Sequence, residues 1–301
     1  MTSKIKERID TISHYVDIDN IKLPRSVKLE LTAICNHKCI YCSLPKLQET
    51  LPIKFMTIDL YKRAVDNLES LKIQELGLFH MGEGTLHPQF NDLVKYASNK
   101  KCFEIFITTN GTKLDALKYC VEQNIKSIKF SLNGYNKKVH KEVTGIDDFE
   151  SVISNLKELI AYRNFIRSKT EISASSIYYD NLEQEEFARK IADIADTFYM
   201  TQIYNHAGKV DNNFIELKNS PYLIMNMCNK PCYGLFTLGH IKVDGTINMC
   251  RFGMDHEFDI GHINEGFDKV WFGSKANEIR KKHLEDQIKT CNKCLGLSLG
   301  K

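Results

Sequence analysis

The chain lacks a membrane-spanning run, a secretory leader and a strong charge of either sign. No apolar stretch approaches the ~20 residues that cross a bilayer, and the segment from Met1 to Asp10 contains no apolar signal-peptide core. The 41 basic and 38 acidic residues leave a net charge of +3. This charge tolerates an anionic substrate but is too small to indicate a nucleic-acid or membrane partner. We therefore expect a cytoplasmic protein.

Cysteine, by contrast, is abundant. The chain has ten cysteines among 301 residues, and a chain of this length buries a core large enough to need no covalent staples. The hydrophobic share, 43%, is close to that of an average globular protein. Because disulfides are rare in a reducing compartment, cysteines there are better read as metal ligands. The composition excludes a disordered chain, a collagen-like fibre and a disulfide-rich miniprotein.

Apolar, often β-branched segments alternate with amphipathic helical patterns over the first two thirds of the chain. This alternation predicts parallel strands with helices outside, at residues 27–34, 75–80, 103–109, 127–132, 170–178 and 197–204. Thr57 and Asn181 are predicted to cap two helices, and Asp147–Asp148 a third that starts near Phe149. We expect an α/β fold, a partial (β/α)6 TIM-like barrel, with its chemistry at the carboxyl ends of the strands.

The composition changes near residue 210. We predict an N-terminal helical extension over residues 1–25, a barrel over 26–210 and a small cluster-binding domain over 211–301. The extension is expected to contain a helix at 5–16. The last domain holds five of the ten cysteines, a hairpin around Gly245, where a tight turn favours positive φ, and a helix near 268–284.

Three cysteines directly follow the first predicted strand. Cys35, Cys39 and Cys42 have the spacing C-x3-C-x2-C. Their thiolates can converge only if the loop wraps around a single bound metal centre. Soft thiolates select zinc or an iron–sulfur cluster. A closed zinc site needs four ligands, and His37 is the candidate fourth, although its place between two cysteines makes simultaneous reach awkward. Three ligands instead leave one iron of a cubane open.

This spacing, at the end of the first strand of a partial barrel, resembles the radical S-adenosylmethionine (SAM) superfamily over residues 27–206. The resemblance implies a [4Fe–4S] cluster on Cys35, Cys39 and Cys42, with SAM chelating the fourth iron. It also implies reductive cleavage of SAM to methionine and a 5′-deoxyadenosyl radical, which abstracts a hydrogen atom from the substrate. The electron would come from a one-electron donor such as flavodoxin or ferredoxin.

Further positions match those that face SAM in this superfamily. Tyr41 matches an aromatic position near the adenine. The segment from His80 to Glu83 resembles a Gly-Gly-Glu motif that receives the SAM amino group through Gly82 and Glu83. Met81 replaces the first glycine, which leaves the contacting atoms open. Residues after the third and fourth strands match positions facing SAM and its ribose, although each alone is typical of a turn: Asn110, Ser131 and Asn133.

A second cysteine pattern lies near the C-terminus. A C-x12-G-x4-C hairpin followed by C-x2-C resembles the Twitch or SPASM auxiliary-cluster domains of radical SAM enzymes, and implies a second [4Fe–4S] cluster on four ligands: Cys232, Cys250, Cys291 and Cys294. No cysteine follows, so the Twitch form with one auxiliary cluster is the better match. Cys228 is a spare thiol or an alternative to Cys232, and a zinc ribbon stays open as another reading. Cys102 and Cys120 are expected to be small buried hydrophobic residues.

Four cysteine ligands leave an auxiliary cluster no open iron for substrate, which favours electron transfer. The leading hypothesis is net dehydrogenation of a small polar molecule, such as a sugar, an aminocyclitol or a nucleotide-linked metabolite, with the auxiliary cluster as electron acceptor. The chain is similar in this respect to single-auxiliary-cluster dehydrogenases of aminoglycoside pathways. One alternative is a peptide-modifying enzyme or epimerase, disfavoured by the few residues before the first strand. A second is a zinc-binding module without enzymatic activity.

The sequence does not identify the residues that bind substrate. His140 and His206 are candidate general bases because imidazole titrates near neutral pH, although a histidine at an element end is more often a satisfied polar group. Tyr204 is a further candidate from the sixth strand. Alternate residues of the fifth and sixth strands face the barrel interior.

Overall fold

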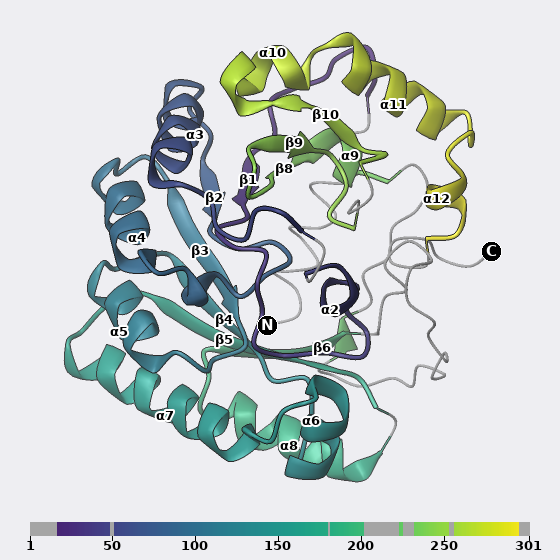
Figure 1. Ribbon diagram of the computed structural model, residues 1–301. Coiled ribbons are helices and arrows are strands. Elements are labelled where there is room, and N and C mark those ends of the chain that lie inside the picture. The colour runs from purple at the N-terminus through teal and green to yellow at the C-terminus, as the bar shows by residue number, and fades with distance from the viewer. Residues whose placement is uncertain are drawn as a thin grey trace.

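The computed structural model describes six stretches of the chain: residues 17–48, 51–179, 181–201, 223–224, 232–252 and 256–294. The predicted helix at 5–16 lies outside them. Among the described residues, ten strands form one sheet in the order β10-β9-β8-β1-β2-β3-β4-β5-β6-β7. The sheet curves, and the helices between successive strands lie on its outer side (Figure 1).

Strands β1 to β6 are parallel neighbours in chain order, as the sequence predicts for a partial barrel. The strands are β1 (Ser26–Leu29), β2 (Glu75–Gly77), β3 (Glu104–Thr109), β4 (Ser127–Ser131), β5 (Glu171–Ile177), β6 (Thr197–Thr201), β7 (Leu223–Ile224), β8 (Leu238–Ile241), β9 (Thr246–Asn248) and β10 (Asp259–His262). The six strands of the barrel lie within the predicted segments, except for a one-residue extension of β1.

The helices are α2 (Leu44–Leu47), α3 (Ile58–Ser70), α4 (Phe90–Asn99), α5 (Leu114–Glu122), α6 (Lys137–Thr144), α7 (Phe149–Phe165), α8 (Leu182–Ala192), α9 (Gly234–Thr237), α10 (Phe267–Trp271), α11 (Ser274–Leu284) and α12 (Lys289–Asn292), with 3-10 turns η1 (Gly84–Leu86) and η3 (Ile263–Glu265). The predicted helix near 268–284 is in fact two helices, α10 and α11, that are separated at Phe272 and Gly273. No described helix is both long and apolar enough to cross a membrane.

Two of the three predicted helix caps are confirmed. The Thr57 side chain accepts a hydrogen bond from the backbone N–H of Leu60, at 3.3 Å, and Asn181 accepts one from Gln184 at 2.8 Å. The third is confirmed in position only: Asp148 is the N-cap residue of α7, but its side chain makes no capping hydrogen bond. Its carboxylate is instead engaged by two histidines.

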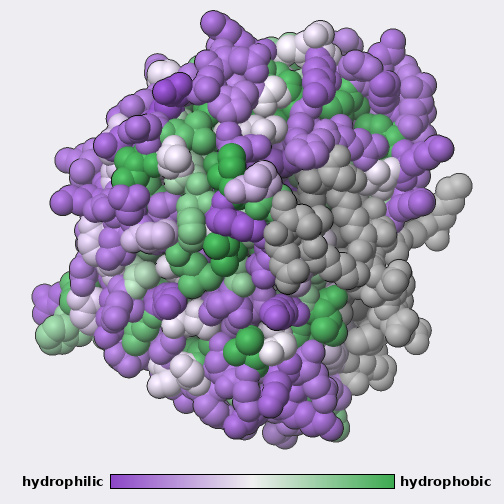
Figure 2. Space-filling model, in the orientation of Figure 1, coloured by the Kyte–Doolittle hydropathy of each residue, from purple (hydrophilic) through white to green (hydrophobic). Residues whose placement is uncertain are grey.

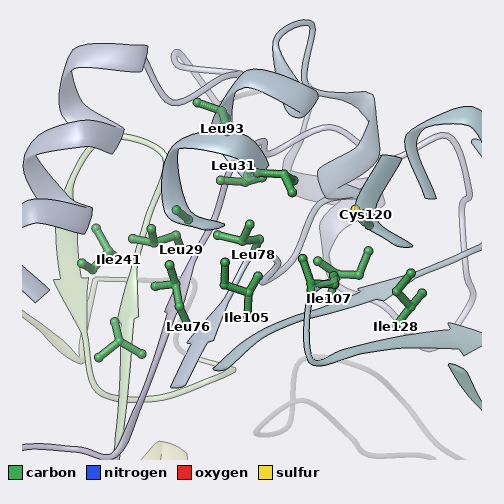
Figure 3. Close-up of a cluster of buried hydrophobic side chains, with 14 of the residues drawn as sticks. Leu29, Leu31, Leu76, Leu78, Leu93, Ile105, Ile107, Cys120, Ile128 and Ile241 are labelled. Carbon is green, nitrogen blue, oxygen red and sulfur yellow. The ribbon is translucent and has the colours of Figure 1, made fainter. Parts of the chain in front are cut away.

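The main hydrophobic core lies between the sheet and the outer helices. Alternate strand residues such as Leu29, Leu76 and Ile107 point into it (Figure 3). Cys120 on α5 belongs to this core and is fully buried, as predicted, whereas Cys102 is exposed, contrary to the prediction. Hydrophilic side chains cover most of the helical rim in the view of Figure 2.

The C-terminal segment adds strands to the barrel sheet. β8 pairs in parallel with β1, with Lys28 opposite His240, and β9 and β10 follow as antiparallel strands. The predicted hairpin joins β8 and β9, and its Gly245 has φ +88°. Trp271 on α10 is fully buried and donates to the Lys22 carbonyl at 2.9 Å. The first cysteine loop therefore follows the carboxyl end of β1, whereas Cys250 follows β9, which runs opposite to β8 and β1. The predicted domain boundary at 210 stays a prediction.

Candidate functional site

The first cysteine loop follows β1 directly. The Cys39 thiol lies within electrostatic range of the Cys35 and Cys42 thiols, so the loop brings the three predicted ligands together. Burial raises the pKa of Cys35 to about 11 and that of Cys39 to about 12, and it also raises the pKa of Cys42. Metal ligation requires the thiolates, so a bound cation must supply the charge that makes deprotonation favourable here.

Backbone hydrogen bonds fix the shape of this loop. The N–H groups of Lys38 and Ile40 donate to the carbonyls of Thr144 and Val143, at 2.8 and 2.9 Å, which ties the loop to the end of α6. Gly145, with φ +74°, follows α6 and leaves room for the Lys38 side chain, because a Cβ there would lie 3.3 Å from Lys38 Cβ.

Two of the cysteine sulfurs already accept backbone hydrogen bonds. His37 N–H donates to Cys35 Sγ and Leu44 N–H donates to Cys42 Sγ, both at 3.4 Å. Hydrogen bonds to cluster sulfurs are among the features that tune the reduction potential of an iron–sulfur centre. The loop geometry therefore fits an iron–sulfur cluster in its donor atoms and in the hydrogen bonds that surround them.

The sulfur spacing separates this site from a zinc site. Thiolates bound to one zinc ion at 2.3 Å lie roughly 3.8 Å apart in tetrahedral geometry. Over the part of the chain that the structure describes, the one group of three or more potential ligand atoms within 4.8 Å of one another comprises His37, His140 and Asp148. Neither cysteine set is gathered tightly enough for a single zinc ion, whereas the corners of a cubane require a wider spread.

His37, the candidate fourth zinc ligand, is turned to a different partner. Its side chain is 2% exposed, and Nε2 lies 2.8 Å from the Asp148 carboxylate. The other oxygen of Asp148 is 2.7 Å from His140 Nε2, and His140 Nδ1 lies 2.8 Å from the Leu132 carbonyl. The carboxylate thus joins the cysteine loop, α6 and the start of α7. Both nitrogens of His140 are engaged, which leaves it no free atom to act as the base considered above.

Removing the Asp148 carboxylate should therefore loosen the cysteine loop. Burial alone would raise the pKa of Asp148, but hydrogen bonds from His37 and His140 hold it below its usual value. We expect Asp148→Ala to lower the free energy of unfolding by about 2–4 kcal/mol, because two buried imidazoles lose their partner. Urea unfolding at pH 7 measures this effect.

The neighbouring Asp147 supplies a matched control. Its ion pairs with Lys137 and Lys141 are exposed, at 3.5 and 3.4 Å, so Asp147→Ala should change stability by less than about 1 kcal/mol. Because the folded-state pKa of Asp148 is lowered, its contribution is present above the unfolded-state pKa and is lost as the pH falls below about 4. Equal destabilisation by the two variants would contradict the assignment.

The predicted SAM motif packs tightly on the end of β1. A Cβ added to Gly82 would lie 2.0 Å from the Thr32 carbonyl oxygen, so the position requires glycine. Glu83 is 4% exposed, and its Oε1 accepts hydrogen bonds from Thr85 N–H, Thr85 Oγ1 and Thr109 Oγ1. Its Oε2 accepts from Asn110 N–H at 2.7 Å. Oε2 thus accepts one hydrogen bond against three at Oε1, and because a carboxylate oxygen can accept more than one, Oε2 is the oxygen that offers an acceptor position to an amino group.

Asn110 and Tyr41 both reach the cysteine loop. Asn110 Nδ2 donates to Asn36 Oδ1 at 2.7 Å, and its side chain also hydrogen-bonds to the Cys35 thiol. The Tyr41 hydroxyl hydrogen-bonds to the Cys39 thiol, so this aromatic residue lies against the cysteine set.

The remaining predicted SAM positions follow β4. Asn133, with φ +54°, adopts the left-handed conformation and accepts a hydrogen bond from the Tyr179 hydroxyl at 3.4 Å. Ser131 ends β4 opposite Ser175 of β5. Among the described residues, neither side chain forms a hydrogen bond to the cysteine loop, so their role toward SAM stays a prediction.

The second cysteine set is also brought together. Cys291 lies within electrostatic range of Cys232, Cys250 and Cys294, although α12 and the hairpin are far apart in sequence. Burial raises the pKa of Cys250 to about 12 and also raises that of Cys291. Four thiols from three segments therefore converge, as the Twitch or SPASM resemblance implies.

The second set is supported by hydrogen bonds like those of the first. Phe252 N–H donates to Cys250 Sγ at 3.4 Å, and Cys232 N–H donates to Nε2 of His283 on α11, at 2.8 Å. A hollow beside Cys232 and Cys250 is lined in part by His240 and Arg251. Cys228, Tyr204 and His206 lie outside the described residues.

Family comparisons agree with both cysteine patterns. Residues 29–191 match the profile described as "Radical SAM superfamily", and residues 232–295 match the SPASM profile, described as an "Iron-sulfur cluster-binding domain". These profiles imply [4Fe–4S] clusters and SAM as cofactors. The first match covers more than half of the chain.

Curated relatives that match are named GTP 3′,8-cyclase. One from Pasteurella multocida is 27% identical over 174 residues, covering 56% of this chain and 50% of the relative. A probable GTP 3′,8-cyclase from Sulfurisphaera tokodaii is 21% identical over 272 residues, covering 80% and 85%. The chain spans about half the length of the first curated relatives it matches.

Solved structures share the fold. BtrN in complex with AdoMet and 2-DOIA superposes with a TM-score of 0.62 at 18% identity, covering 94% of this chain and 98% of that one. Streptococcus suis SuiB bound to the precursor peptide SuiA gives 0.69 at 14% identity, covering 87% and 68%. These similarities concern the fold alone. The ligands and the peptide in these structures are those of BtrN and SuiB.

Proposed function

The chain belongs to the radical SAM superfamily, and on this premise we propose that it dehydrogenates a small polar substrate, with a second iron–sulfur cluster as the electron acceptor. The observation that carries the proposal is the convergence of two separate cysteine sets, one of three thiols and one of four. The first set leaves a coordination position for SAM, while the second is complete without substrate.

The residues around the first set suit the binding of a cluster and SAM. Cys35, Cys39 and Cys42 would hold the cluster, which when bound and reduced supplies the electron that cleaves SAM to methionine and a 5′-deoxyadenosyl radical. Glu83 Oε2 offers an acceptor for the SAM amino group. The glycine at position 82 brings the backbone of this motif against β1, and Asn110 links the motif to the cysteine loop.

The proposed reaction balances. One hydrogen atom leaves a carbon of the substrate to form 5′-deoxyadenosine, and a hydroxyl or amine of the substrate loses a proton to solvent. The remaining electron passes to the centre on Cys232, Cys250, Cys291 and Cys294, so the substrate loses two hydrogens in total. We also propose a cytoplasmic location, with flavodoxin or ferredoxin as the donor of the first electron.

A second candidate is ring closure within a purine nucleotide. It is favoured by the curated relatives, whose name describes cyclisation of GTP. Joining two atoms of one molecule can leave its mass unchanged, whereas dehydrogenation makes it lighter by two hydrogens. Modification of a peptide, suggested by the likeness to peptide-bound SuiB, is the third outcome that a product assay distinguishes.

Product mass tests the proposal directly. The anaerobically reconstituted chain is reduced with dithionite and given SAM and panels of sugars, aminocyclitols, nucleotides and peptides. We expect 5′-deoxyadenosine together with an equal amount of a product two hydrogens lighter than a small polar substrate. A product of unchanged mass from a nucleotide, a modified peptide, or 5′-deoxyadenosine without any oxidised product would each overturn dehydrogenation.

A further inference from the structure

Two lysines project from the inner face of the sheet, opposite the main core. In β1, Val27 and Leu29 are buried in the core, so Lys28 between them points to the inner side. Ile128 and Phe130 likewise place Lys129 of β4 on that side. Gly77 on β2 makes space for the first lysine, because a Cβ there would lie 2.9 Å from Lys28 Cγ.

In the part of the chain that the structure describes, aromatic rings rather than carboxylates contact these amines. Lys28 Nζ lies 5.3 Å from the centre of the Phe79 ring, and Lys129 Nζ lies 5.8 Å from that of Tyr199 on β6. Such contacts attract a cation, but they do not neutralise it. The inner face is thus cationic on two strands that are three places apart in the sheet.

Among the described residues, little negative charge lies near Lys28. Burial, together with the charges of Arg251 and Lys129, lowers the pKa of Lys28 to about 7, and Glu75 is the one described group that opposes this shift. Glu75 is itself paired with Arg25, at 2.9 Å. The charged form of such a buried amine is stabilised by any anion that binds beside it on the inner face.

Two buried histidines extend the same face. The rings of His80, after β2, and His240, on β8, lie 4.7 Å apart, with side-chain exposures of 4% and 0%. Among the described residues, none of their four ring nitrogens has a hydrogen-bond partner of normal geometry, and neither does Glu30 Oε1. His240 lies near the backbone of Asn248, and His80 Nδ1 is 3.6 Å from Glu30 Oε1. Buried polar atoms are rarely left unpaired, and an exception calls for an explanation such as strain, a redox or catalytic role, or a bound water or ion.

The two histidines lie on segments that lead toward the two cysteine sets. His80 begins the segment that contains Gly82 and Glu83, and His240 lines the hollow beside Cys232 and Cys250. β8 and β1 pair so that His240 lies opposite Lys28. A substrate that reaches both SAM and the auxiliary centre would pass over this face.

We propose that the inner face between the two cysteine sets binds a phosphate group of the substrate, held by Lys28, Lys129 and Arg251, with His80 and His240 as hydrogen-bond partners. A phosphate dianion offers two negative charges and several acceptor oxygens, which suits three cations better than a single carboxylate does. The inference deepens the proposed function, on which it rests for placing the substrate here, and it assigns the substrate to the phosphorylated small molecules.

Binding of inorganic phosphate tests this site without turnover. The reconstituted holoenzyme is saturated with SAM and its thermal midpoint is measured with phosphate, acetate or chloride at matched ionic strength. A ligand that binds only the folded state raises the midpoint with its concentration. We expect a concentration-dependent rise with phosphate, and less than a third of that rise with acetate or chloride.

Three variants connect the effect to the lysines. Lys28→Met and Lys129→Gln should each reduce the phosphate-dependent rise at least threefold, while Lys28→Arg should retain it. Lys126→Met is the matched control. Lys126 directly precedes β4, the strand that carries Lys129, and its exposed amine pairs with Glu104 at 3.2 Å. Lys28→Met should also raise the midpoint without phosphate, since it removes a poorly compensated buried amine.

The proposal is overturned if phosphate gives no rise, if acetate matches phosphate, or if both Lys28→Met and Lys129→Gln respond like the native chain. Should one variant fail to fold, the other decides. These outcomes do not depend on the reaction type, because no SAM is cleaved in the assay. A phosphate response combined with an unoxidised product would therefore retain the site and reject dehydrogenation.

Discussion

Replacing Cys39 with alanine abolishes formation of 5′-deoxyadenosine, down to the level of a reaction without protein. Cys39 is the central member of the first set, within electrostatic range of Cys35 and Cys42 and hydrogen-bonded to Tyr41. Two remaining thiolates cannot hold three corners of a cluster, so SAM has no iron to bind. Chromatography of an anaerobic, dithionite-reduced reaction measures the product.

The matched control for this variant is Cys102→Ala. Cys102 is exposed and lies outside both cysteine sets, so its removal should leave 5′-deoxyadenosine formation unchanged. Bound iron provides an independent readout, because Cys39→Ala should lose about four irons per chain and keep about four in the second set. If Cys39→Ala still cleaves SAM, the first centre is misassigned.

Replacing Cys291 and Cys294 together separates SAM cleavage from substrate oxidation. Both belong to the four-thiol set that converges on Cys232 and Cys250. The first centre lies on a separate loop, held by α6 and by Asp148, so the double variant should still form 5′-deoxyadenosine. It should yield no oxidised product, because the substrate radical has lost its electron acceptor.

The ratio of oxidised product to 5′-deoxyadenosine is the decisive quantity for the double variant. We expect it to fall from about one in the native chain to near zero, as the electron balance requires. A ratio that stays unchanged would show that the second set does not accept the electron. Loss of both products would show instead that the second set is needed for SAM cleavage.

The sequence predicts the strands and helices of the barrel because the patterns that indicate them are local. Alternation places Val27 and Leu29 in the core and leaves Lys28 on the other face, and Thr57 and Asn181 cap their helices through neighbouring N–H groups. Cysteine spacing identified both sets in the same way. Such patterns depend on a few adjacent residues, which the sequence displays directly.

Other features depend on residues far apart in the chain. Asp148 has the chemistry of a helix cap, but it bonds to His37, 111 residues away, because two buried imidazoles compete for its oxygens. The contact between His80 and His240 requires β8 to pair with β1. No local sequence pattern indicates that pairing. The sequence alone therefore does not predict the cationic inner face.

Iron and sulfide counts on the native chain, after anaerobic reconstitution, test the central claim most directly. Two separate thiolate sets, one with a position left for SAM, predict about eight irons and eight sulfides per chain. About four of each, or a chain that keeps zinc in place of iron, would contradict the account.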